Sequence, residues 1–67
     1  MCLAQVYMEK EGEPFGQEVV LSAVAWIEVQ PGRLVLRDLL GKEKVVPGEI
    51  STVDFESGVV TLSRLGR

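Results

Sequence analysis

Hydrophobic and polar residues alternate with a period of two along most of this chain, and that period is typical of β-strands. The first alternating segment covers residues 2–8, and its even-numbered residues share one face: Cys2, Ala4, Val6 and Met8. Further segments rich in β-branched residues follow at regular spacing: residues 18–29, 34–39, 43–46, 50–55 and 59–65. Because these runs are short and no segment has a convincing helical period, the pattern predicts an all-β protein.

The segment EVVLSAVAWIEV, residues 18–29, is long for a single strand. A helix is the competing interpretation, since alanine and leucine are good helix formers. The β-branched and aromatic residues of the segment favour a strand instead. We therefore expect either a pair of strands or one bent strand, with the bend near Ser22.

Glycine and proline residues separate the predicted strands. The clearest turn is QPGR, residues 30–33, in which Gly32 can take the positive φ of a type II turn. The other connections are EKEGEPFG at residues 9–16 and short turns at residues 40–42, 47–48 and 56–58. The pattern predicts one domain, residues 1–67, built as a small six- or seven-stranded antiparallel barrel (SH3- or Sm-like), with a compact sandwich as the alternative.

The length of the chain adds a constraint, because 67 residues form only a small core. Folding at this length buries roughly 60% of the surface that the unfolded chain exposes, so the isolated domain is expected to be only marginally stable. Disulfides, metals or self-association commonly stabilise such domains, and a single cysteine excludes an internal disulfide. We therefore expect a homodimer.

The composition is that of a soluble globular protein, with 46% hydrophobic and 25% charged residues. The start MCLAQVYMEKEGE lacks the basic and apolar regions of a secretory signal, and no apolar run reaches the ~20 residues of a membrane span. We therefore expect a cytoplasmic protein with no membrane association. The net charge of −3 argues against a dominant phosphate-binding surface.

The candidate chemistry is limited because the chain contains no histidine. A Ser-His-Asp or Cys-His site cannot be built, and no zinc-protease, dinucleotide-binding or P-loop motif occurs, so we do not expect an enzyme. RNA binding is an alternative, since small β-barrels bind single strands and Arg33, Lys42 and Lys44 fall at predicted hairpin ends. None of the four aromatic residues lies in a basic cluster, which favours ordinary solvated charges.

Cys2 is the remaining candidate, and it is the only cysteine in the chain. It is either a small apolar residue on the inner face of the first strand, where free cysteines are often buried, or a metal ligand. The pattern alone favours burial. Ligation is chemically possible because the terminal amine lies close by and titrates near neutral pH.

The N-terminus can chelate a metal whether or not Met1 is removed. Without Met1, the amine and thiolate of Cys2 close a five-membered ring; with Met1, the amine, the Cys2 amide nitrogen and the thiolate chelate together. When each arm supplies one nitrogen and one sulfur, two arms in a two-fold dimer supply two nitrogens and two sulfurs. In a square plane this set suits Ni(II) or Cu(II), whereas zinc prefers a tetrahedron.

Two stretches resemble the CooT family of small proteins: the MCLA start, and GRLVLRDLLGKEKVVPGEISTVDFESGVVTL at residues 32–62. Within the second stretch, VPGEI to VDF followed by a hydrophobic strand is the most similar part. Members of this family are associated with the maturation of nickel carbon monoxide dehydrogenase. They bind nickel as dimers, with the cysteine after the initiator methionine as the critical ligand. Related members have also been described as predicted RNA-binding proteins.

The resemblance implies that Cys2 is a nickel ligand and that each dimer holds one Ni(II). It also implies that Gly41, Pro47-Gly48 and Asp54 are turn positions of the fold. The loop at residues 9–16 and Trp26 depart from the family pattern, which leaves the client enzyme open. The expected protein is a metallochaperone whose partners are a second copy and a nickel enzyme or its maturation factors. An RNA-binding barrel and a purely structural oligomer are the alternatives.

Overall fold

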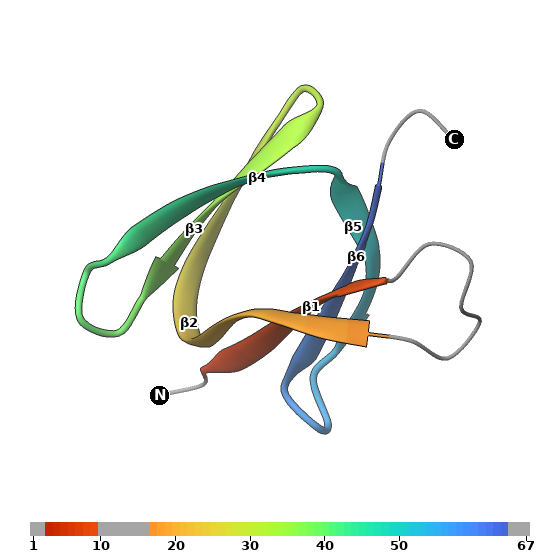
Figure 1. The fold of residues 1–67 in the computed structure, drawn as a ribbon. Helices are drawn as coiled ribbons and strands as arrows, with labels where there is room; N and C mark the ends of the chain where they lie inside the picture. The colour runs from red at the N-terminus through yellow and green to blue at the C-terminus, as the bar shows by residue number, and fades with distance from the viewer. Residues whose placement is uncertain (1–2, 10–16, 65–67) are drawn as a thin grey trace.

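The structure is a computed structural model, and it describes residues 3–9 and 17–64. Six strands form one sheet in the order β4-β3-β2-β1-β6-β5 (Figure 1). In chain order they are β1 (Ala4–Glu9), β2 (Gln17–Gln30), β3 (Arg33–Asp38), β4 (Glu43–Pro47), β5 (Glu49–Asp54) and β6 (Val59–Ser63). The all-β prediction is confirmed, and six strands are present in this part of the chain. No helix among the described residues is long and apolar enough to cross a membrane.

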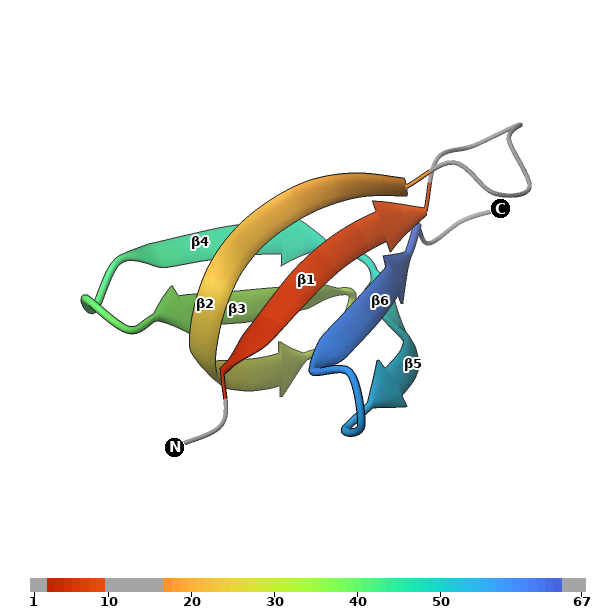
Figure 2. The ribbon, with the colours of Figure 1, turned by 90° about the horizontal axis from the view of Figure 1, so that it is seen from below.

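The long segment predicted as a strand pair or one bent strand is a single bent strand, β2. Its first half pairs with β1 and its second half pairs with β3. Between Val24 and Leu21 the register with β1 shifts, which places a bulge at Ser22 and Ala23. Ala23 also has a positive φ of 55°. Because a bulge sharpens the local bend, β2 can curve from β1 around to β3, as Figure 2 shows.

The predicted closed antiparallel barrel is wrong in two respects. First, β1 and β6 pair in parallel, with Val6 opposite Val60. Second, within the described residues β4 pairs only with β3 and β5 only with β6, so the sheet stays open. Gly48 alone joins these two edge strands, whereas a hairpin needs a connection of about two residues. The chain therefore turns at Gly48 and continues at the other end of the sheet.

The core is formed by alternate residues that the curled sheet turns inward. Its buried hydrophobic residues are Val6, Met8, Val24, Leu34, Leu36, Val46, Val60 and Leu62. In β1 and β3 the buried residues alternate with more exposed ones, as the sequence pattern predicts. In β6 three successive residues are buried, including Thr61, because this strand lies between β1 and β5.

Two aspartates organise turns through hydrogen bonds to backbone N–H groups. The Asp38 carboxylate accepts from Leu40 at 3.0 Å and from Lys42 at 2.8 Å, in the β3–β4 turn. The Asp54 carboxylate accepts from Glu56 at 2.9 Å and from Ser57 at 3.1 Å, in the β5–β6 turn. Aspartate favours turns for this reason. The turn role that the family resemblance implies for Asp54 is confirmed.

The hydrogen bonds of Asp54 make stability depend on pH. The Ser57 hydroxyl, then the N–H groups of Ser57 and Glu56, hold the pKa of Asp54 below its ordinary value of 3.8. Because the folded-state pKa is depressed, this stabilisation is present above pH 3.8 and is lost as the pH falls through the folded-state pKa. We expect Asp54→Asn to lower the midpoint of thermal unfolding at neutral pH and to reduce its decline in acid. Calorimetry from neutral pH to below 3.8 measures both effects.

The control for this prediction is Glu56→Gln, which removes the same charge from the same turn. It leaves the carboxylate that accepts the turn hydrogen bonds in place. We expect it to keep the acid-dependent decline of the wild-type protein. Identical acid profiles for Asp54→Asn and the wild-type protein would contradict the role assigned to Asp54.

Candidate functional site

The predicted ligand Cys2 lies outside the described residues, so the site is approached from the strand that follows it. β1 is a central strand between β2 and β6. Val6 and Met8 are 0% and 5% exposed, which confirms that they anchor the strand on its inner face, and Ala4 is half-buried. The Gln5 N–H donates to the Gly58 carbonyl at 2.9 Å. The chain is therefore held on both sides from the first residues after Cys2.

An apolar pocket of about 290 Å³ lies where β1 and β6 begin and β5 ends. Its lining includes Leu3, Trp26, Val53, Phe55 and Val60. Trp26 and Phe55 are 41% and 91% exposed, so the rim of the pocket is unusually apolar for a free surface. The pocket borders Leu3, the residue bonded to Cys2, and it is suited to apolar contacts rather than to metal ligation.

The described part of the chain holds no ready-made metal centre. Among residues 3–9 and 17–64, no three His, Cys, Asp or Glu side chains lie close enough together to hold a metal ion. Several carboxylates there serve other contacts: those of Asp38 and Asp54 organise turns, and that of Glu43 accepts from Arg37 at 2.7 Å. Cys2 with the N-terminus therefore stays the candidate ligand set.

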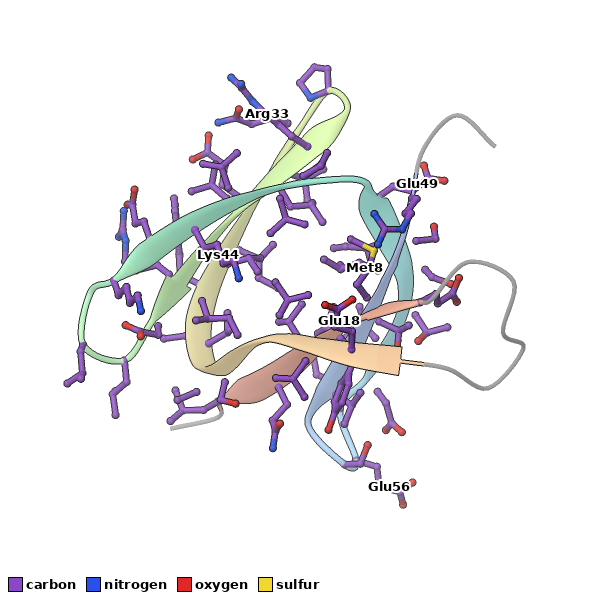
Figure 3. The ribbon with its side chains drawn as sticks, in the orientation of Figure 1. Met8, Glu18, Arg33, Lys44, Glu49 and Glu56 are labelled. Carbon is purple, nitrogen blue, oxygen red and sulfur yellow. The ribbon has the colours of Figure 1, made fainter. Side chains whose placement is uncertain are left out.

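The three basic residues of the RNA-binding alternative do not form one surface. Arg33 begins β3 and Lys42 follows the end of that strand, which separates their backbones by about 20 Å of extended chain. The Lys44 ammonium on β4 donates to the Val20 carbonyl at 3.1 Å. In Figure 3, the Arg33 side chain lies near the turn between β2 and β3, whereas Lys44 lies along β4, away from that turn. The structure thus gives the RNA-binding alternative no shared basic groove.

Trp26, which the sequence marks as unusual, is covered by a basic side chain. The Arg37 guanidinium lies 4.1 Å from the centre of the indole ring, and it also donates to Glu43. Trp26 and Arg37 are directly opposite each other in the register of β2 and β3, which permits this cation–π contact. The sequence shows only an aromatic residue at a strand position. The contact with Arg37 depends on the register between β2 and β3, and the pattern of hydrophobic and polar residues does not specify that register.

Comparison with known proteins accounts for nearly the whole chain. Residues 1–63 match the family model described as "CO dehydrogenase accessory protein CooT". The chain belongs to the CooT family. This membership confirms the resemblance that the MCLA start and residues 32–62 indicate.

A solved relative has the same fold. The crystal structure of a protein from Carboxydothermus hydrogenoformans, assigned as a CooT, matches with a TM-score of 0.82 at 20% identity, over 97% of this chain and 100% of that one. At this identity the likeness concerns the fold alone. No curated protein matches the chain. The CooT family is described as an accessory protein, which agrees with the expected non-enzymatic role.

Proposed function

We propose that this CooT-family protein is a cytoplasmic nickel-binding accessory protein. It works as a homodimer that captures one Ni(II) through the two Cys2 side chains and delivers it to a nickel enzyme such as carbon monoxide dehydrogenase. The observation that carries this proposal is the family match, which begins at residue 1 and so includes the only cysteine.

The donor atoms at the N-terminus suit this metal. Each chain contributes the Cys2 thiolate and a nitrogen from the terminal amine or the following amide. Two chains complete a four-coordinate set of two sulfurs and two nitrogens, which in a square plane suits Ni(II) or Cu(II).

Exposed leucines on the far side of β2 from the start of β1 support self-association at this end of the sheet. Leu39 and Leu40, in the β3–β4 turn, are 52% and 91% exposed. The Leu39 N–H donates to the Ala23 carbonyl at 2.9 Å. The residue after Ala23, Val24, pairs with Ala4 at the start of β1. A second copy that covers these leucines would lie near the start of β1, where Ala4 pairs with Val24.

Titration with Ni(II) under native mass spectrometry tests the proposal. We expect a dimer that takes up one Ni(II) per two chains, because neither arm alone completes the coordination. The mass of the same sample also shows whether Met1 is retained. Binding of one Ni(II) per chain to a monomer, or no binding at all, would contradict the shared site.

A further inference from the structure

An exposed apolar face surrounds the start of β1. It consists of the apolar pocket described above, Phe55 on the rim of that pocket, and Leu39 and Leu40 in the β3–β4 turn. In both Figure 1 and Figure 2, the start of β1 lies between the β3–β4 turn and the β5–β6 turn. Exposed apolar residues gathered in one place are typical of an interaction surface.

Phe55 projects from this face at a fixed position. It is 91% exposed and belongs to the β5–β6 turn, in which the Asp54 carboxylate accepts hydrogen bonds from two backbone N–H groups. The Gly58 N–H donates to the Asp54 carbonyl at 2.9 Å, and the Gly58 carbonyl accepts from the Gln5 N–H at 2.9 Å. These bonds fasten the turn to β1, so the ring of Phe55 is held beside the pocket at little further cost in conformational entropy.

The pocket has the size and lining to accept one aromatic ring. An apolar cavity of ~150 Å³ holds a benzene molecule, and this pocket has a volume of about 290 Å³. Among the described residues that line it, only Asp54 is charged, and its carboxylate is directed to the backbone of the turn. The centre of a protein interface is likewise poor in charged residues and rich in aromatic ones.

The proposed nickel site indicates which molecule covers the apolar face. Cys2 is bonded to Leu3, and Leu3 lines the pocket. Consecutive Cα atoms are ~3.8 Å apart and a metal–thiolate bond measures ~2.3 Å, so a metal on the Cys2 thiolate lies within roughly 10 Å of the Leu3 Cα. One Ni(II) shared by two chains therefore brings their Leu3 Cα atoms within roughly 20 Å of each other. At that separation a second copy covers the face around Leu3.

We propose that the apolar face is the homodimer interface and that Phe55 of each chain enters the partner's pocket. This inference rests on the proposed function, which requires a second copy at the N-terminus. A two-fold interface uses the same patch on both chains, so it needs a projection and a hollow side by side. Phe55 and the pocket supply this pair. Each Phe55 ring then packs against Leu3 and Trp26 of the other chain, while Leu40 lies at the edge of the interface.

Sedimentation of the metal-free protein over a series of concentrations tests the inference without nickel. Phe55→Asp should raise the dissociation constant of the dimer at least ~100-fold, because each dimer loses two central aromatic side chains. Val29→Asp is the matched control, at an exposed residue near the β2–β3 turn, and it should leave the dimer intact. Leu40→Asp should have a smaller effect than Phe55→Asp. Circular dichroism establishes that the three variants are folded.

The fluorescence of Trp26, the only tryptophan, gives a second readout inside the pocket. Dilution of the wild-type protein should shift the emission to longer wavelength, because water replaces the partner's Phe55 when the dimer dissociates. Phe55→Asp should emit at this longer wavelength at every concentration. Val29→Asp should follow the wild-type protein. Emission that does not change with dissociation would contradict entry of Phe55 into the pocket.

Several results would overturn the inference: a metal-free wild-type protein that is monomeric throughout the series, an intact Phe55→Asp dimer, or an equal loss in Val29→Asp. A larger loss in Leu40→Asp than in Phe55→Asp would place the second copy on the β3–β4 turn instead. Failure of the proposed function gives a different pattern. A dimer that depends on Phe55 but takes up no Ni(II) would contradict the nickel site alone, and an intact Phe55→Asp dimer with one Ni(II) per two chains would contradict the interface alone.

Discussion

The Cys2→Ser variant is expected to bind Ni(II) at least ~100-fold more weakly than the wild-type protein. A serine hydroxyl stays protonated at neutral pH, so the substitution removes both negatively charged sulfur ligands of the proposed dimer site. Loss of an outer-shell partner already costs 10–100-fold in metal affinity, so loss of a direct ligand should cost at least as much. Calorimetry measures the affinity, and the thiolate-to-nickel charge-transfer absorption should disappear. Equal binding by both proteins would refute the assignment.

Two controls isolate the N-terminal ligands. Met8→Leu removes a buried sulfur that is 5% exposed, and it should leave nickel binding unchanged. A Gly-Ser extension before Met1 keeps the thiol but moves the terminal amine away, so it should weaken binding if the amine is a ligand.

Gly48→Ala is expected to be severely destabilising for a change of one methyl group. Gly48 has a φ of +139°, and an added Cβ would lie 2.6 Å from the Ser63 carbonyl oxygen, on the last residue of β6. Its N–H donates to the Gly32 carbonyl at 3.2 Å, so the chain cannot shift away without losing that bond. Backbone strain and overpacking together should cost roughly 3 kcal/mol or more. For a domain of this size, thermal unfolding should occur at least ~12 °C lower.

Gly41→Ala is the matched control for this clash. Gly41 also has a positive φ, of +87°, but an added Cβ would meet nothing within 4 Å. Only the left-handed backbone conformation is penalised there, at a cost of about 1–2 kcal/mol. Urea denaturation of both variants gives the comparison. Equal losses of stability would show that the contact with Ser63 does not restrict Gly48.

The corner at Gly48 also shows why the sheet was harder to predict than its strands. Pro47-Gly48 is visible in the sequence as a break between two β segments. Whether the following strand folds back on the preceding one or crosses to the far edge depends on which partner is free. That partner is β6, which is itself placed by parallel pairing with β1 at the other end of the chain.

The sequence alone suggests the candidate metal ligand, Cys2, but it does not predict the apolar pocket. A single cysteine next to the N-terminus, without histidine, is a property of the sequence alone, and the family match covers that position. The pocket needs Leu3, Trp26 and Phe55 from three separate parts of the chain. Their proximity depends on the bend of β2 and on the strand order, which periodicity does not encode.

The sequence by itself determined the all-β class, the approximate strand limits, the bend near Ser22 and the family. These features arise from alternation, turn chemistry and motif content within short stretches, where the energetic preferences are local. Only the tertiary structure decided that β1 and β6 are parallel and that the sheet remains open. These features depend on pairing between distant residues, because a strand segment carries the same alternation whichever neighbour it meets.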